Sequence, residues 1–127
     1  EFINLIQISN ISYGFIRKGI CLGFVICLRE NTNYQSINYK FFQNRHNKFF
    51  YIDRIAIANK YQSSGIGSIL YKKLLSIKVK FNIPICAEVN IDPPNESSIN
   101  FHRKHGFSEI TESTLKEGYS VVYMEVS

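Results

Sequence analysis

The sequence lacks any apolar stretch that approaches the roughly 20 residues needed to span a bilayer. Its first residues, Glu1-Phe2-Ile3-Asn4, include neither an initiator methionine nor a basic segment, so we do not expect them to form a signal peptide. We therefore expect a cytoplasmic protein without a membrane partner. We also expect the N-terminal segment to be truncated.

Cysteines are few and odd in number: Cys21, Cys27 and Cys86 lie within apolar segments. This pattern predicts buried free thiols in a reducing compartment rather than a disulfide framework. No metal-ligand spacing along the chain links the cysteines to the three histidines, His46, His102 and His105. We therefore expect no metal.

An excess of negative charge is also absent, because the 127 residues carry a net charge of +5. That length is typical of one domain, which we take to span residues 1–127. The positive charge would attract a polyphosphate cofactor or a nucleic acid. Because the sequence has neither an aromatic-basic RNA signature nor a zinc knuckle, we do not expect direct nucleic-acid recognition.

The most informative segment that is present combines an apolar strand, a glycine turn and a helix. Residues 49–58 are β-branched and aromatic, and the turn Gln62-Ser63-Ser64-Gly65-Ile66-Gly67 follows them. Apolar residues then recur at spacings of three and four, as in a helix, at Ile66, Ile69, Leu70, Leu74, Ile77 and Phe81. Converging backbone N–H groups at such a junction favour a phosphate or pyrophosphate, although a tight connection packed by glycines is the alternative.

Two common phosphate motifs are excluded at this turn. No Lys-Ser or Lys-Thr pair follows the glycines, so the turn is not a Walker loop. Only two glycines are present and no acidic residue ends a second strand at the position that such a motif requires, so it is not a dinucleotide fingerprint.

A second informative segment begins with a short apolar strand over residues 83–91, which Asp92-Pro93-Pro94 ends. Asn95 is well placed to cap a helix of about ten residues. Gly106 stands where a left-handed residue is expected after that helix, and Phe107 follows as its apolar partner. The two apolar strands around the long helix predict a right-handed βαβ unit with parallel strands.

The remaining chain predicts further strands and one long loop. Strands are expected over residues 13–17 and 20–29, joined by a hairpin turn at Lys18-Gly19, and over residues 119–126. Residues 30–48 are polar and rich in asparagine but carry several aromatic residues, which predicts a structured loop. This loop could form the wall of a substrate pocket or simply cover the edge of the sheet.

The two glycine-containing segments together resemble the GNAT family of acyl-CoA-dependent N-acyltransferases. The turn Gln62–Gly67 is similar to the family's pyrophosphate-binding motif, Q/R-x-x-G-x-G/A. Asn95 and the run Phe101-His102-Arg103-Lys104-His105-Gly106-Phe107 are similar to its second signature. The resemblance runs from about residue 13 to the C-terminus. It implies an α/β fold with a central, mixed, twisted sheet, a βαβ acyl-CoA-binding unit and flanking helices. In the family, the two strands of this unit splay apart and the pantetheine arm of the cofactor runs between them.

The resemblance also implies which residues hold acetyl-CoA, the co-substrate. The backbone of Ile55, Ala56 and Ile57 would pair with the pantetheine arm and polarise the thioester carbonyl. Backbone amides would bind the pyrophosphate at Gln62, Ser63, Ser64, Gly65, Ile66, Gly67 and Ser68. Asn95 would reach toward the pantetheine arm, with a plain helix cap as the alternative. The chain departs from the family at Ser63-Ser64, where a basic residue is common.

Candidate catalytic residues are His102, Asp53 and Glu88. His102 stands where the family usually has a tyrosine that protonates the departing thiolate, and the alternative is a histidine on the helix surface. Asp53 shares a strand face with Tyr51 and could act as a base or bind the amine, or form a structural ion pair. Glu88 could act as a base or make a structural hydrogen bond.

We interpret the chain as an N-acetyltransferase that transfers an acetyl group from acetyl-CoA to a primary amine by direct attack. The acceptor would be a small-molecule or peptide amine, bound by Tyr34, Tyr39 and Tyr51. Two alternatives stay open: a non-catalytic acyl-CoA-binding module, and an acyltransferase that acts on a protein or aminoacyl-tRNA amine. A homodimer is also left open.

Overall fold

The computed structural model describes residues 3–9 and 11–127, with side chains from residue 11 onward. The described chain divides into two compact units. Unit 1 comprises Glu1–Leu28 and Ile52–Asn82, and unit 2 comprises Arg29–Tyr51 and Ile83–Ser127. Strand β4 (Phe50–Ile57) therefore begins in unit 2 and ends in unit 1.

Unit 1 contains three antiparallel strands in the order in which they occur along the chain, followed by most of β4. The three are β1 (Ile3–Ser9), β2 (Ser12–Arg17) and β3 (Ile20–Arg29), the last of which ends one residue into unit 2. The predicted hairpin turn between β2 and β3 is confirmed. Lys18 and Gly19 have φ values of 50° and 76°, as a two-residue turn with both residues left-handed requires.

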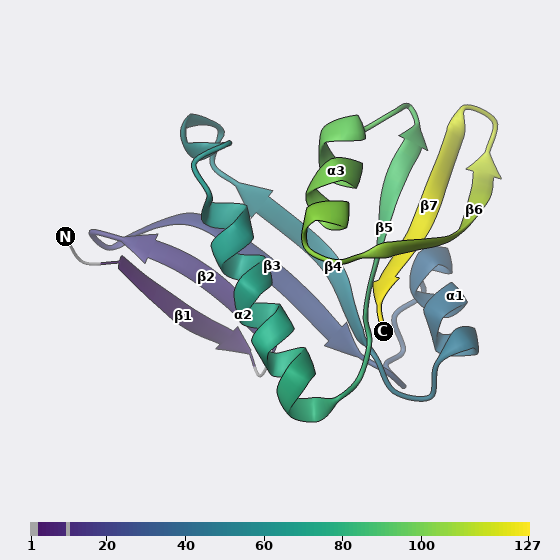
Figure 1. Cartoon of the computed structure of the whole chain (residues 1–127), viewed down its shortest axis with the longest axis horizontal. Coiled ribbons are helices and arrows are strands. Elements are labelled where there is room, and N and C mark those ends of the chain that lie inside the picture. Colours follow the sequence, from purple (N-terminus) through teal and green to yellow (C-terminus); the bar gives the residue numbers. More distant parts are fainter. Residues whose placement is uncertain (1–2, 10) are drawn as a thin grey trace. The chain divides into compact units, whose positions relative to one another are not determined.

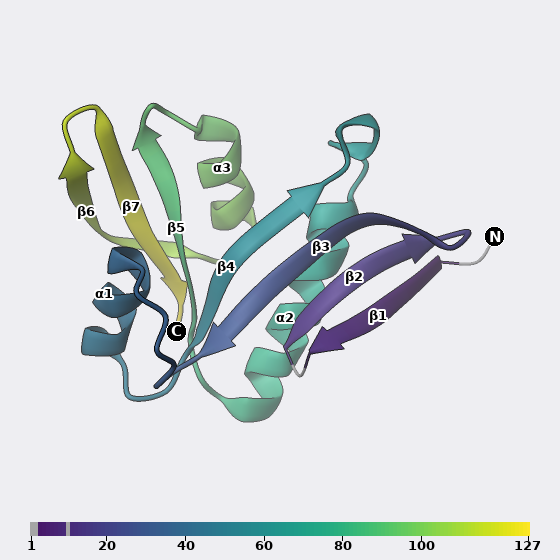
Figure 2. The same ribbon diagram turned by 180° about the vertical axis from the view of Figure 1, so that it is seen from behind.

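The long helix α2 (Ile66–Phe81) packs against β2 in unit 1. Figures 1 and 2 show it along one face of β1, β2 and β3. The apolar stripe that the sequence predicted is partly confirmed, because Ile66, Leu70 and Leu74 are buried. Ile69 and Phe81, which were also assigned to it, are exposed. Asn82, in the left-handed conformation, ends the helix, and its N–H donates to the carbonyl of Lys78.

In unit 2 the strand order is β4, β5 (Ile85–Asp92), β7 (Tyr119–Val126) and β6 (Ser108–Lys116). The start of β4 pairs with β5 in parallel, as predicted, through Phe50–Ile85 and Tyr51–Cys86. The ladders from β5 to β7 and from β7 to β6 are antiparallel. Strand β6 was not predicted, because its exposed, polar sequence lacks an apolar run.

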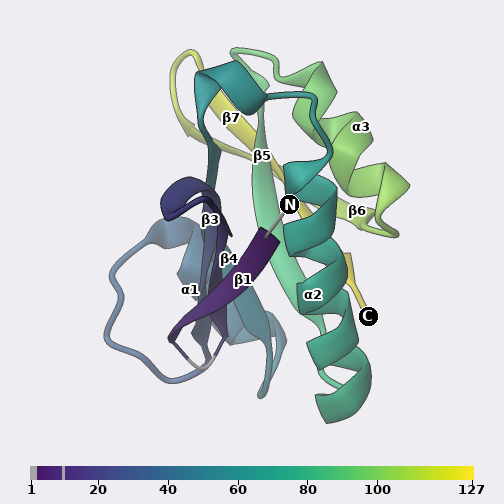
Figure 3. The same cartoon turned by 90° about the vertical axis from the view of Figure 1, so that its left-hand side faces the viewer.

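Helices α1 (Ile37–Arg45) and α3 (Glu96–Lys104) cover opposite faces of the strands of unit 2, as Figure 3 shows. The structured loop predicted over residues 30–48 is thus partly wrong, because nine of its residues form α1. Ser36 caps this helix by accepting a hydrogen bond from the N–H of Tyr39.

An aromatic core holds α1 in place. Tyr39 and Phe42 are fully buried, and their ring centroids lie 5.4 Å and 5.9 Å from that of Tyr51. Phe42 also lies 5.4 Å from Tyr123 on β7. Burial of each large aromatic side chain is worth about 2–3 kcal/mol, which exceeds the weak helix propensity of this segment.

The cysteines only partly match the sequence prediction. All three are free, and Cys27 and Cys86 are buried, but Cys21 is exposed. None of the helices in the described part of the chain has the length and apolar character that a membrane span requires.

Candidate active site

The predicted pyrophosphate turn lies in unit 1, between the end of β4 and α2. A single 3-10 turn, η1 (Asn59–Tyr61), follows β4, and Gly65 then caps α2 with φ of 92°. Ser63 is also left-handed, with φ of 64°. These two left-handed residues let the chain turn from η1 into the first turn of α2.

The backbone of this turn is open to an incoming group. A Cβ atom placed on Gly65 would meet no atom within 4 Å. The cap makes no side-chain hydrogen bond, and no acidic residue occupies the first turn of α2. The N–H groups of Ile66 and Gly67 belong to that first turn, where a helix supplies no acceptors of its own. Together with the helix dipole, such donors favour a bound anion.

Gln62 braces the turn against the strand. Its amide nitrogen donates to the carbonyl of Ile57 at 3.4 Å and to the side-chain oxygen of Asn59 at 3.3 Å. Gln62 itself is exposed, as are Ser63 and Ser64. The seven residues predicted to bind pyrophosphate, Gln62 to Ser68, thus form one continuous structure within unit 1.

Gly23 on β3 is a positioning residue that the sequence analysis did not identify. A Cβ atom there would come within 2.7 Å of the side chain of Ile57 and 3.1 Å of the carbonyl oxygen of Ala56. It would also come within 3.1 Å of the side chain of Ile66. Only glycine therefore lets β3 approach both the predicted pantetheine strand, Ile55–Ile57, and the start of α2 this closely. A lone glycine within an apolar strand was the available signal.

Asp53 lies half-buried on β4 in unit 1, and its neighbour Arg54 is exposed. The pKa of the Cys27 thiol is raised to about 12. Burial is the larger cause, and the negative charge of Asp53 is the smaller one. Cys27 is therefore a neutral thiol at pH 7, and it cannot act as a nucleophile there.

Glu88 and Tyr51 meet in unit 2. The Tyr51 hydroxyl donates to Glu88 Oε1 at 2.5 Å, and Tyr51 is 1% exposed. Across the β5–β7 ladder, Glu88 stands opposite Tyr123. Burial raises the pKa of Tyr123, a hydrogen bond with Ser113 partly offsets that effect, and the Glu88 charge raises it further. Glu88 is thus a half-buried carboxylate held by one tyrosine and close to a second.

Asn95 caps α3, as predicted, by accepting a hydrogen bond from the Ser98 N–H at 3.3 Å. The helix ends as the sequence analysis expected, with Gly106 left-handed at φ of 91°. Two backbone bonds close the end, from Gly106 N to Arg103 O and from Phe107 N to His102 O, each of 3.0 Å.

His102 is buried on α3, with 4% of its surface exposed. Its Nδ1 lies 2.7 Å from the carbonyl oxygen of Ser98, so Nδ1 carries the proton of the neutral ring. Burial lowers the pKa of His102; the bond to Ser98 opposes this, and the nearby His105 lowers the pKa further. The environment therefore favours a neutral imidazole at pH 7, whereas proton donation from a histidinium would need the charged form.

Of the tyrosines predicted to bind the acceptor, Tyr39 lies wholly in the core. Its hydroxyl donates to the carbonyl of Arg29 at 2.5 Å and accepts from the N–H of Thr32 at 3.2 Å. Tyr34 is exposed, and its ring centroid lies 5.7 Å from that of Tyr39. The hydroxyl of Tyr39 is therefore engaged within unit 2.

A cleft of about 400 Å³ in unit 2 was not predicted. It lies between α1 and the β6–β7 hairpin and is lined by Ile37, Lys40, Phe41, Asn44, Thr111, Glu112, Ser113 and Tyr123. Phe41 and Tyr123 stack at its wall with centroids 3.9 Å apart, and the Tyr123 hydroxyl donates to Asn38 at 2.9 Å. The cleft thus offers a flat aromatic surface together with one cationic and one anionic side chain.

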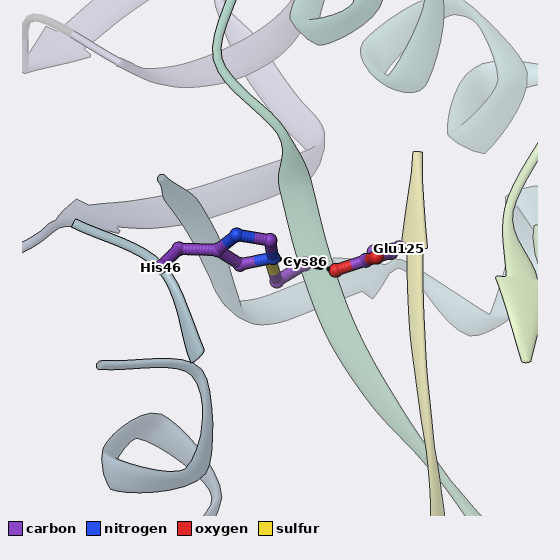
Figure 4. A group of neighbouring side chains, drawn as sticks. All are labelled: His46, Cys86 and Glu125. Atoms are coloured by element: carbon purple, nitrogen blue, oxygen red, sulfur yellow. Dashed lines mark hydrogen bonds and ion pairs between the residues drawn. The ribbon is translucent and has the colours of Figure 1, made fainter. Parts of the chain in front are cut away.

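One further group in unit 2 has the donors of a metal site. His46, Cys86 and Glu125 place one ligand atom each within 4.8 Å of one another. Figure 4 shows the three side chains converging from the end of α1 and from two neighbouring strands. His46 Nε2 lies 2.6 Å from Glu125 Oε1, and Arg45 makes a two-pronged ion pair with the same carboxylate at 3.0 Å and 3.1 Å. Burial alone would raise the pKa of Glu125, but its bonds to Arg45 and His46 lower it. The sequence analysis did not identify this group, because its members are about 40 residues apart along the chain.

Comparison with known proteins bears on the fold and on the family. Residues 8–107 match the model of the acetyltransferase (GNAT) family. No curated protein sequence matches the chain.

Several solved structures are similar in fold. Naa50 from Arabidopsis thaliana, in complex with the bisubstrate analogue CoA-Ac-MVNAL, is 21% identical with a TM-score of 0.70 over 92% of this chain and 72% of that one. The ribosomal-protein-S18-alanine N-acetyltransferase from Escherichia coli is 18% identical with a TM-score of 0.66, over 91% and 67% of the two chains. An IAA acetyltransferase from Bacillus cereus is 15% identical with a TM-score of 0.65, over 91% and 75%.

Proposed function

Because the chain belongs to the acetyltransferase (GNAT) family, we propose that it transfers an acetyl group from acetyl-CoA to an amine by direct attack. The observation that carries this proposal is the open turn at the start of α2, where Gly65 is left-handed and no atom lies near its missing Cβ. The solved structure of Naa50 contains a CoA-derived group, which supports CoA as the co-substrate here.

In the proposed reaction the amine nitrogen attacks the thioester carbonyl carbon, the C–S bond breaks, and the amine proton is released as the CoA thiolate takes one up. The turn from Gln62 to Ser68 binds the pyrophosphate through backbone N–H groups. The backbone of Ile55 to Ile57 runs beside the pantetheine arm, and Gly23 fixes the position of that strand. Most of the rate enhancement comes from holding amine and thioester in line.

On the acceptor side we assign Glu88 as the general base that accepts the proton of the amine. The hydrogen bond from Tyr51 fixes the Glu88 carboxylate. Tyr123, which stands opposite Glu88 in the β5–β7 ladder, also lines the cleft. The cleft between α1 and the β6–β7 hairpin would hold the group that carries the amine. The aromatic wall and the charged side chains Lys40 and Glu112 would select it.

A peptide or protein amine and a small-molecule amine both fit this proposal. Naa50 from Arabidopsis thaliana is in complex with the bisubstrate analogue CoA-Ac-MVNAL, and the similar protein from E. coli is a ribosomal-protein-S18-alanine N-acetyltransferase, which favours a peptide acceptor. The net charge of +5 would suit an acidic protein or an aminoacyl-tRNA as the carrier of the amine.

A non-catalytic acyl-CoA-binding module is the second candidate, and one observation favours it. His102, at the position predicted to protonate the thiolate, is buried and its pKa is lowered. In an active enzyme, solvent or another group must then supply that proton.

The cofactor site is tested with two variants that differ by one charge. Gly67 lies in the first turn of α2, where a carboxylate is favourable to the helix but repels a pyrophosphate. Gly67→Asp should lower the affinity for CoA in calorimetry by at least about tenfold, while the melting temperature stays equal or rises. Gly67→Asn is the matched control, and its affinity for CoA should fall much less. Equal affinity in the two folded variants would exclude this turn as the pyrophosphate site.

A further inference from the structure

We propose that His46, Cys86 and Glu125 form a binding site for a divalent transition-metal ion, with zinc as the ion that best suits the donors. The inference is independent of the proposed acetyl transfer, because none of the three residues belongs to the cofactor turn or lines the cleft. It also departs from the sequence prediction of no metal.

The donor set is selective. One thiolate, one imidazole and one carboxylate match zinc and exclude calcium and magnesium, which take oxygen ligands. A tetrahedral zinc ion with bonds of about 2.0–2.3 Å needs ligand atoms roughly 3.3–3.6 Å apart. The three atoms already lie within 4.8 Å of one another, and the His46–Glu125 separation of 2.6 Å must open by less than about 1 Å.

The backbone holds these donors in place. Cys86 and Glu125 are direct partners in the β5–β7 ladder, so their side chains share one face of the sheet. His46 ends α1, and its N–H donates to the carbonyl of Phe42 at 2.9 Å. The ion would therefore join the end of α1 to the two central strands of unit 2.

The surroundings also suit an ion. Cys86 is fully buried, whereas 22% of the His46 side chain and 11% of the Glu125 side chain are exposed to solvent. An ion can thus enter from the His46 side, and water can complete its coordination. Arg45 orients the carboxylate from outside as a second partner, with Nη2 3.0 Å from Oε2 and Nε 3.1 Å from Oε1. Oε1 is the oxygen that lies beside the imidazole, 2.6 Å from His46 Nε2.

Charge and proton balance are simple. Binding breaks the S–H bond of Cys86, a metal–sulfur bond forms, and the proton leaves to the buffer. The ion replaces the His46–Glu125 hydrogen bond, and the proton on Nε2 of the neutral imidazole moves to Nδ1 so that Nε2 can bind the ion. A doubly charged ion in exchange for the thiol proton adds one net positive charge to a group that already contains a carboxylate and a guanidinium. No redox step is involved.

Cobalt(II) is the direct probe of the site, since a thiolate ligand gives it an intense charge-transfer absorption. We would treat the whole chain with a chelator under reducing conditions and titrate it with Co²⁺ and then Zn²⁺. The Cys21→Ser background removes the one exposed thiol. We expect a charge-transfer band that saturates at one ion per chain and disappears when Zn²⁺ is added.

Variants separate this site from adventitious binding. Cys86→Ser and His46→Gln should each abolish the band, whereas Cys27→Ser, which removes the other buried thiol, should leave it unchanged. Zn²⁺ at a hundredfold excess over its Kd should raise the melting temperature by about 10 °C in the parent but not in His46→Gln. His46 is partly exposed, so its variant keeps the test valid if Cys86→Ser does not fold. No band in the parent, or the same band in His46→Gln, would show that the three residues form only a hydrogen-bonded ion-pair network.

Discussion

At the scale of single residues, the chemistry of His102 depends on packing that the sequence does not display. The motif predicted a histidine near a thiolate, and either a catalytic or a surface role was open. The structure buries the ring among the residues that follow α3, with Phe107 5.1 Å away between centroids. Burial depends on contacts from outside the helix, so the helical pattern alone could not decide the protonation of this side chain.

We predict a pH dependence of stability that His102 causes. Its folded pKa lies below the unfolded value of about 6.5, so the unfolded state binds more protons in that range. Its contribution is therefore fully present above about pH 6.5 and is lost as the pH falls toward the folded pKa. Urea unfolding at pH 7.5 and 5.5 should show a loss in the wild type that is smaller in His102→Gln. Glu30 and Glu125, whose pKa values are lowered, act only below about pH 4.5. An equal loss in both proteins would contradict the buried, neutral state of His102.

At the scale of elements, the sequence predicted the helices and strands that have clear local sequence signals. The βαβ unit, the β2–β3 hairpin, β7 and both ends of α3 follow from periodicity, capping residues and glycines. Helix α1 has no such signal, because its nine residues are rich in polar and aromatic side chains and carry no clear apolar stripe. Contacts of Tyr39 and Phe42 with Tyr51 and Tyr123 stabilise it instead. The cleft escaped prediction for the same reason, since its walls join residues 37–44 to residues 111–123.

The charged side chains at the two walls of this cleft should affect the KM for the acceptor. We predict opposite effects for the acidic and the basic residue. An amine arrives mainly as an ammonium ion at pH 7. Glu112→Gln should raise the KM for a cationic acceptor, and Lys40→Ala should lower it, each by roughly twofold to fivefold, since exposed charge pairs are worth up to about 1 kcal/mol. Both residues are exposed, so stability should change little. The KM for acetyl-CoA, measured in the same assays, serves as the control. Parallel changes in both variants would argue against the cleft as the acceptor site.

At the scale of the whole molecule, family membership is shown, and the sequence motifs were sufficient for it because glycine turns and caps are local. The chemistry is distributed differently. The turn proposed to bind the cofactor, Gln62–Ser68, and Asp53 lie in unit 1, whereas Glu88, His102, the cleft and the proposed metal site lie in unit 2. Groups that combine distant segments, such as Tyr51 with Glu88 or His46 with Cys86, depend on strand register. That register cannot be derived from one sequence.

Turnover by the complete chain decides between an enzyme and a binding module. We predict that CoA thiol is released from acetyl-CoA above the buffer rate with at least one acceptor from a panel of peptide α-amines and alkylamines. Because only the neutral amine attacks, kcat/KM should level off near pH 8 for an α-amine and continue to rise toward about pH 10 for an alkylamine. Glu88→Gln should lower kcat/KM by roughly 10²-fold or more if the carboxylate takes part in deprotonation, with CoA affinity unchanged.

Gly67→Asp is the internal control in this assay, since it should lose turnover through the cofactor turn while Glu88 is intact. Release that matches buffer for every amine, in a protein that still binds CoA tightly and loses that binding in Gly67→Asp, would establish the binding module instead. Release that Glu88→Gln leaves unchanged would remove Glu88 from the reaction. The half-buried carboxylate would then serve as the hydrogen-bond partner of Tyr51, a structural role that a lower melting temperature of the variant would reveal.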